Sequence, residues 1–201
     1  MAITNGYCTL AELRARLQFA DTDTEDDAIL ESIVTAVSRM IDNYTGRRFY
    51  TTSNDETRYY TSEHPDVLYC PDDIVSITTL QTDEDGDRTY ETTWTTADYD
   101  LEPYNASLDG QPYTRVRVNK STGSRAFPTQ AKAIQITGKF GWGASVPVVV
   151  KEACLLQCER LYKRKDAPFG VLGAGGMGQA TVIPQLDPDV ALLLSQYVRM
   201  L

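Results

Sequence analysis

A chain of 201 residues, of which 42% are hydrophobic and 23% charged, has the size and balance of an ordinary globular protein with one sizeable core. Its net charge of −9 is concentrated between residues 50 and 139, where fifteen acidic side chains accompany eight basic ones. Because sequence-independent DNA binding needs clustered Lys and Arg, this charge disfavours a conventional DNA-binding protein. It is compatible with a protein that DNA passes without being bound.

Two helices are expected in the first 49 residues. Thr9 and Glu12 have the spacing of a capping box at the start of a short helix. A longer helix follows, for which Thr24 is the expected N-cap and Gly46 the expected stop. Apolar residues recur in this second helix at intervals of three or four, which predicts one buried face: Ile29, Ile33, Val37, Met40, Ile41 and Tyr44.

A β-rich region is expected over residues 50–142. Thr, Tyr and Val become common there, with Pro, Gly, Asn and Asp between the runs. A hairpin is predicted from residues 74–81 and 88–94, which an acidic turn ending in Asp-Gly connects. YTRVRVN (113–119) and AIQITGKF (133–140) alternate apolar and polar residues, as half-buried antiparallel strands do.

Helix is expected to return in the last part of the chain. One helix should begin at Ser145 with Pro147 in its first turn, where the missing N–H costs nothing. A final helix should begin with Asp187 as its cap and Pro188 as its first residue, and run to the end. The glycine-rich run between them, GVLGAGGMGQATVIPQL, predicts a linker.

Together these elements predict an α+β fold. None of the helices is long enough to bury its apolar face alone, so the N-terminal helical part, 1–49, should share one bundle core with the C-terminal part, 143–201. The antiparallel β-rich region, 50–142, is then an insertion between them. No apolar run approaches the roughly 18 residues of a membrane span, so no membrane partner is expected.

The cysteines and the single histidine do not predict a catalytic or metal site. Cys154 and Cys158 share a helix face, but a zinc site would need two further ligands. The other candidates, Cys8, Cys70 and His64, are scattered among unrelated segments, so the helical pair is interpreted as small apolar core residues. We assign no catalytic residue, cofactor or metal, and do not expect an enzyme. Without an evident secretory signal, the four thiols should be reduced in a cytoplasmic compartment.

Two short runs have the composition of ligand-binding motifs without their context. GAGGMG (173–178) follows a helix and a loop, whereas a dinucleotide-binding loop follows a strand and opens a helix. DEDGD (83–87) lacks the twelve-residue span and the flanking helices of an EF-hand, so it is interpreted as a solvated turn.

Two stretches resemble the head–tail connector (adaptor) family of long-tailed bacteriophages. YCTLAELRARLQF and TEDDAILESIVTAVSRMIDNYTGRRF place a short helix before a long one, and ITGKFGWG with VPVVVKEACLLQCERLYKRKDAP joins a strand, a glycine turn and a helix. The resemblance implies a homo-oligomeric ring, typically a dodecamer, in the virion neck, assembled in the host cytoplasm. Such a ring docks on the portal protein, extends the channel through which double-stranded DNA passes without specific binding, and offers a surface to the next neck or tail-completion protein.

For a member of that family, the strand–helix junction would fix the angle between the helical and β parts. Gly141 and Gly143 permit a tight path, Trp142 can wedge the junction, and Pro147 starts the helix. A fixed angle between the helical and β parts would matter for a ring, because a heterologous interface closes only at the right rotation.

Two further sets are expected to face other molecules. Some of Asp83, Glu84, Asp85 and Asp87 should face the DNA channel or a neighbouring ring, or else only keep the chain soluble. The apolar face of the last helix should dock on the chain's own core, a neighbouring subunit or the portal, so that deleting residues 180–201 would abolish portal binding and leave the rest folded. This face comprises Val190, Leu193, Leu194, Tyr197 and Val198.

Two other functions compete with this interpretation. The first is a small ligand- or carbohydrate-binding module, although tyrosines on strands are more often cross-strand packing partners. The second is a hydrolase whose site assembles in space, which no motif supports. The binding module would use the aromatic residues of the β part: Tyr90, Trp94, Tyr99, Tyr104 and Tyr113.

Overall fold

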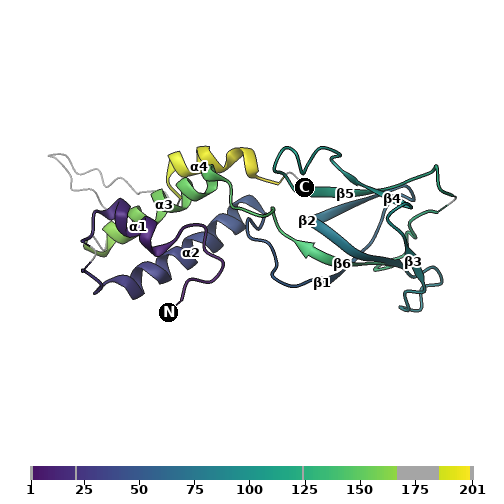
Figure 1. Cartoon of the computed structure of the whole chain (residues 1–201), viewed down its shortest axis with the longest axis horizontal. Helices are drawn as coiled ribbons and strands as arrows, with labels where there is room; N and C mark the ends of the chain where they lie inside the picture. The colour runs from purple at the N-terminus through teal and green to yellow at the C-terminus, as the bar shows by residue number, and fades with distance from the viewer. Residues whose placement is uncertain (1, 21, 124, 167–185, 200–201) are drawn as a thin grey trace, which may run out of the picture. The chain divides into compact units, whose positions relative to one another are not determined.

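The computed structural model describes residues 2–20, 22–123, 125–166 and 186–199. The chain forms two compact units (Figure 1): Met1–Gly46 with Val146–Met200 make a helical unit, and Arg47–Ser145 make a β unit. The fold class is therefore α+β, as the sequence predicts. Among the helices described, none combines the length and the apolar character that crossing a membrane requires.

Helix α3 is the centre of the helical unit. Helices α1, α2 and α4 all pack against it, which confirms that the N-terminal and C-terminal helices share a core. Short 3₁₀ turns follow α3 at Arg164–Asp166 and α4 at Ser195–Tyr197. The four helices are α1 (Leu10–Leu17), α2 (Asp27–Thr45), α3 (Val148–Lys163) and α4 (Pro188–Leu194).

The ends of α1 and α2 follow local side-chain chemistry. The capping box of α1 is present, since the Glu12 N–H donates to Thr9 Oγ1 and the Thr9 N–H donates to Glu12 Oε2. Gly46 ends α2 with a left-handed φ of +66°, as predicted. The predicted N-cap was wrong: a turn separates Thr24 from the helix, and Asp26 occupies the N-cap position without a capping hydrogen bond from its side chain.

The buried face of α2 differs from the predicted one. Ile29 is 45% exposed and Tyr44 41% exposed, so both ends of the predicted stripe face solvent. Apolar residues occupy more than one side of this helix, and periodicity alone does not decide which side the neighbouring helices cover. The residues that the structure buries are Leu30, Val34, Val37, Ser38, Ile41 and Thr45.

The two C-terminal helices begin close to where the sequence places them. Pro147 is the N-cap of α3 and therefore lies just before the first turn instead of within it. Asp187 caps α4, and Pro188 is its first residue, as predicted. Helix α4 ends at Leu194 and passes into a 3₁₀ turn, so the expected helix to the chain end was too long. The glycine-rich run between the helices lies, apart from its last residue, outside the described residues.

The β unit is built on one antiparallel sheet in the order β1-β6-β2-β5-β4, with β3 pairing with β2 beside this path. The predicted hairpin is present, since Leu80 of β2 lies opposite Trp94 of β3, but its second strand covers only Thr92–Trp94 of the predicted 88–94. Its first strand begins seven residues earlier than predicted, because the pairing with β5 passes through an irregularity that contains Pro71. The strands are β1 (Glu56–Tyr60), β2 (Val67–Thr82), β3 (Thr92–Trp94), β4 (Tyr99–Glu102), β5 (Tyr113–Val118) and β6 (Ile134–Phe140).

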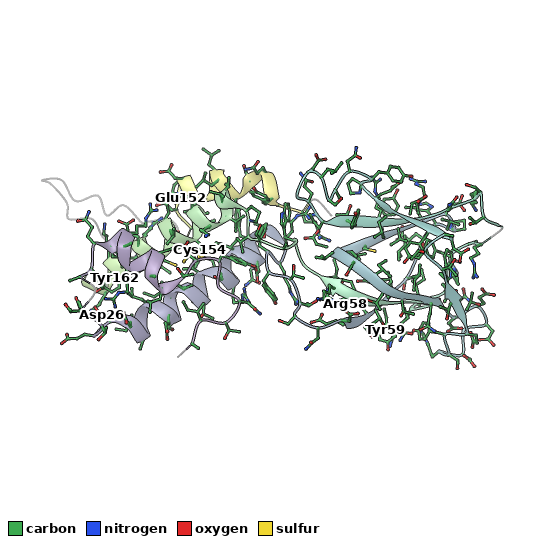
Figure 2. The ribbon with its side chains drawn as sticks, in the orientation of Figure 1. Asp26, Arg58, Tyr59, Glu152, Cys154 and Tyr162 are labelled. Carbon is green, nitrogen blue, oxygen red and sulfur yellow. The ribbon has the colours of Figure 1, made fainter. Side chains whose placement is uncertain are left out.

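One apolar cluster fills the β unit. Strands β5 and β6 alternate as predicted, and their buried residues include Val116 and Ile136. The Trp94 and Phe127 rings stack with centroids 4.7 Å apart and an interplanar angle of 8°. On β1, the Arg58 guanidinium (Figure 2) lies 4.0 Å from the centroid of the Phe140 ring.

Candidate assembly surfaces and a buried thiol cluster

The strand–helix junction contains one glycine, Gly141, at which a side chain would collide with the backbone. Gly141 has a φ of +127°, and a Cβ atom built on it would lie 2.0 Å from the Tyr50 carbonyl oxygen. Its N–H donates to the Asp73 carbonyl oxygen at 2.9 Å. Gly143 is different: a Cβ there would meet nothing within 4 Å. The tight path predicted for this turn therefore depends on Gly141.

Trp142 is a packed side chain of the β unit, only 8% exposed. Its ring lies 5.3 Å from the Phe49 ring, and its Nε1–H donates to the Gly110 carbonyl oxygen at 3.0 Å. The Arg47 guanidinium lies 5.4 Å from the centroid of the indole. These contacts fix the indole within the β unit. Its effect on the angle between the two units stays a prediction.

An ion pair lies beside this junction. Arg47 Nη1 is 2.5 Å from Asp73 Oδ1, and the Asp73 side chain is only 2% exposed. Without its partner, a charge buried this deeply would strongly destabilise the folded state. The pair connects the first residue of the β unit to strand β2, next to the point where Gly141 hydrogen-bonds to the Asp73 backbone.

The acidic hairpin tip divides into one structural carboxylate and three exposed ones. Asp83 is buried, and its two oxygens accept the N–H groups of Gly86 and Arg88 at 2.7 and 2.9 Å. Burial raises the pKa of Asp83, but these hydrogen bonds outweigh it, so the net pKa lies below its ordinary value. Asp83 therefore holds the turn, and its carboxylate is not exposed on the surface of the chain. Glu84, Asp85 and Asp87 are exposed.

The predicted docking face of the C-terminal helix is largely occupied. Val190 and Leu194 are fully buried in the helical unit, where α4 packs on α3. Leu193 and Tyr197 are half-buried. Leu192, which the predicted face omitted, is 75% exposed. Three leucines in succession must point to different sides of a helix, and the sequence does not say which side is covered.

The accessible apolar surface of this segment is therefore smaller than predicted. Among the residues described there, the exposed apolar side chains are Leu192 and Val198, the latter 37% exposed. The cap residue of α4 is also tied to the core helix, because Asp187 Oδ2 lies 2.9 Å from Arg160 Nη1. Three partners are predicted for the apolar face: the chain's own core, a neighbouring subunit or the portal. Val190 and Leu194 pack against the first of these, the chain's own core.

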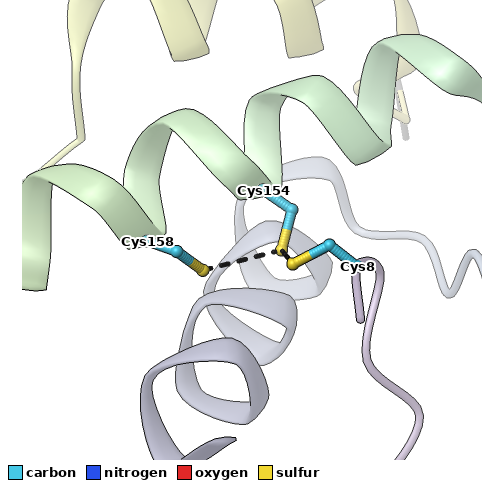
Figure 3. A group of neighbouring side chains, drawn as sticks. All are labelled: Cys8, Cys154 and Cys158. Atoms are coloured by element: carbon cyan, nitrogen blue, oxygen red, sulfur yellow. Dashed lines mark hydrogen bonds between the residues drawn. The ribbon is translucent and has the colours of Figure 1, made fainter. Parts of the chain in front are cut away.

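Three cysteines meet in the core of the helical unit. Cys8 Sγ lies 3.6 Å from Cys154 Sγ, and Cys154 Sγ lies 3.9 Å from Cys158 Sγ (Figure 3). All three side chains are buried. The sequence interpretation that placed Cys8 in an unrelated segment was wrong. The contact could not be seen in the sequence, because 146 positions separate Cys8 from Cys154. Cys70 does lie elsewhere, on β2 of the other unit.

The segment before α1 brings Cys8 to this place. The Tyr7 N–H donates to Ser38 Oγ on α2 at 3.0 Å, and Ser38 Oγ lies 3.8 Å from Cys154 Sγ. Hydrogen bonds from the Cys158 and Cys8 thiols lower the pKa of the Cys154 thiol below its ordinary value. Because the Cys8 and Cys158 thiols donate these hydrogen bonds to Cys154, their own pKa values are raised, and burial adds to the effect. Of the three thiols, Cys154 is thus the one whose pKa its neighbours lower.

The aromatic residues of the β part do not form a shared binding face. Trp94 and Tyr99 belong to the buried cluster, and Tyr90 and Tyr113 are half-buried. Tyr104 is exposed. The ligand-binding module predicted as the alternative therefore loses the aromatic platform on which it depended.

No protein-family model matches the chain, and no curated protein sequence matches it either. Solved structures do match along its whole length. A chain from the neck of an empty gene transfer agent particle, computed with C6 symmetry, is similar with a TM-score of 0.59, at 19% identity over 100% of this chain and 95% of that one. A chain from the neck of the native particle, computed with C12 symmetry, has a TM-score of 0.58 at 19% identity, over 100% and 94%. A chain from the virion of the native particle has a TM-score of 0.58 at 20% identity, and the match covers 100% of this chain and 95% of that one. The shared property at this identity is the fold.

Proposed function

We propose that this chain is a structural protein of the neck of a phage-like particle. In this proposal it is a head–tail connector whose copies close a homo-oligomeric ring, a dodecamer, between the portal protein and the next neck or tail-completion protein. The observation that carries the proposal is the similarity of fold, over the whole chain, to chains from the neck of gene transfer agent particles. The protein acts through its surfaces, without a catalytic step.

The distribution of charge supports a channel role. Residues 50–139 carry fifteen acidic and eight basic side chains, and Glu84, Asp85 and Asp87 are exposed at one hairpin tip. Carboxylates release no counterions from DNA and repel its phosphates. A ring that carried these side chains on its inner wall would let double-stranded DNA pass without holding it.

Exposed apolar side chains supply candidate contacts with neighbouring proteins. Leu192 and Val198 lie in the C-terminal segment, and Val148 lies at the start of α3, where it is 81% exposed. Contacts that bury such side chains contribute about 1.5–3 kcal/mol each when the burial is complete. We assign Leu192 and Val198 to portal or subunit docking, while Val190 and Leu194 hold α4 in place.

Co-assembly with the portal tests the proposal. The purified chain and the portal ring from the same genome should form a complex in light scattering whose added mass equals about twelve copies. Free subunits can be monomeric and assemble only on the portal, so the experiment uses the mixture. In particles that lack the chain, filled heads without tails are expected. The proposal fails if the chain neither binds the portal nor occurs in purified necks.

A further inference from the structure

The three sulfur atoms of the buried cluster have the dimensions of a metal site. Cys8 and Cys158 lie 3.6 and 3.9 Å from Cys154, and all three sulfurs lie within 4.8 Å of one another. Sulfurs bound to one Zn²⁺ at about 2.3 Å with tetrahedral angles are about 3.8 Å apart. Figure 3 shows the three side chains converging from α3 and from the segment before α1.

Ser38 provides an oxygen for a fourth position. Its Oγ is buried and lies 3.8 Å from Cys154 Sγ. In a tetrahedral zinc site, a bound sulfur and a bound oxygen are about 3.6 Å apart. The Ser38 hydroxyl donates to the Val34 carbonyl oxygen and accepts the Tyr7 N–H, which leaves one of its two lone pairs for a cation.

We infer that this cluster binds one thiophilic closed-shell cation of the Zn²⁺ type, with Cys8, Cys154 and Cys158 as thiolate ligands and the Ser38 hydroxyl as the fourth donor. Thiolate ligands select soft and borderline cations over magnesium and calcium. On binding, the three thiol protons leave, and the cation neutralises two of the three thiolate charges. This inference is independent of the proposed role in a neck.

The cation joins parts of the helical unit that are distant in sequence. Cys8 precedes α1, Ser38 lies on α2, and Cys154 and Cys158 lie on α3. One ion therefore connects three elements of the same core. A ligand that binds the folded chain and not the unfolded chain raises stability with its free concentration.

The test uses the untagged full chain, reduced with a phosphine that does not bind zinc. Titration with Zn²⁺ alone, and with Cd²⁺ alone as a spectroscopic probe, should give one equivalent per chain and a cadmium–thiolate absorption band. X-ray absorption at the zinc edge should show three sulfurs and one oxygen. Each of C8S, C154S and C158S should lose binding, and S38A should weaken it about tenfold.

Cys70→Ser is the matched control, because Cys70 is also buried but lies in the β unit. It should bind Zn²⁺ as the wild type does. Ordinary packing of three thiols predicts no stoichiometric Zn²⁺, and that result overturns the inference. A zinc shell with fewer than three sulfurs overturns it too, as does a cluster variant that binds like the wild type. If a cluster variant does not fold, the wild-type protein decides the question. A zinc shell of three sulfurs and one oxygen, and a thermal midpoint that rises with Zn²⁺, support the inference, and the absence of either overturns it.

Discussion

The position that a Cβ atom would take on Gly141 lies 2.0 Å from the carbonyl oxygen of Tyr50. Real side chains do not approach backbone oxygen this closely, and the φ of +127° is itself unfavourable for any residue but glycine. The backbone at the end of β6 is thus pressed against the start of the β unit. Within the run GKFGWG, the absence of a side chain at Gly141 is what permits this contact.

Gly141→Ala should therefore lower the free energy of unfolding by about 2–4 kcal/mol, since backbone strain and displacement of the Tyr50 carbonyl act together. Urea denaturation followed by tryptophan fluorescence measures the loss. Gly123→Ala is the control, because a Cβ at Gly123 meets nothing within 4 Å. That variant should stay within about 0.5 kcal/mol of the wild type. Equal stability of the two variants would contradict the contact.

The Arg47–Asp73 ion pair allows a test of burial at constant distance. Asp73→Ala leaves the Arg47 charge without this partner and should cost about 3–5 kcal/mol. The pair between Lys120 and Asp66 has the same N–O distance of 2.5 Å, but its side chains are 55% and 53% exposed. Asp66→Ala should therefore cost less than about 1 kcal/mol. Similar losses in the two denaturation curves would show that burial is not the deciding factor.

The buried carboxylate of Glu102 should make stability depend on pH. A hydrogen bond from Arg117 holds the pKa of Glu102 below its ordinary value of 4.5. A group whose pKa is lower in the folded state stabilises the fold above its unfolded pKa, and this stabilisation is lost as the pH falls through the folded value. The wild type should accordingly be more stable than Glu102→Gln at pH 7, and the difference should shrink below about pH 4.5.

Chemical denaturation at pH 7, 5, 4 and 3 measures this difference. Glu63→Gln is the control, since Glu63 is an exposed side chain on the loop after β1. Its curve should follow that of the wild type at every pH. A difference between the wild type and Glu102→Gln that stays constant down to pH 3 would contradict the prediction.

The sequence predicts the elements of this fold better than it predicts what they cover. The Thr9 capping box, the Gly46 stop and the Asp187 cap are local patterns, and the structure contains all three. The buried side of α2 was predicted wrongly at Ile29, because periodicity defines a stripe and only the neighbouring helices select it. The irregular first part of β2 was missed because Pro71 argues against a strand.

The candidate sites depend even more on contacts between distant residues. Nothing near Cys8 in the sequence indicates that it meets Cys154, because the contact requires the chain to return from the β unit. Asp83 has the same residue type as its exposed neighbours Asp85 and Asp87, and only the turn geometry separates them. Sequence patterns identify such residues as candidates, and the packing of the chain decides their roles.

Leu192 and Leu194 give a further prediction, because two leucines of one short helix have opposite environments. Leu194 is fully buried, so Leu194→Ala should cost about 2–5 kcal/mol through lost burial and a cavity. Leu192 is 75% exposed, so Leu192→Ala should change stability by less than about 0.5 kcal/mol. If Leu192 contacts the portal, the same substitution should weaken binding to the portal ring severalfold in a sedimentation assay.

Deletion of residues 180–201 should then unfold or destabilise the helical unit, because it removes Val190 and Leu194 from the core. This outcome is opposite to the sequence-based expectation that the remaining chain stays folded. Circular dichroism of the truncated chain, compared with Leu192→Ala, separates loss of folding from loss of docking. A truncated chain as stable as the wild type would show that α4 is a detachable docking arm, whatever its contacts with α3.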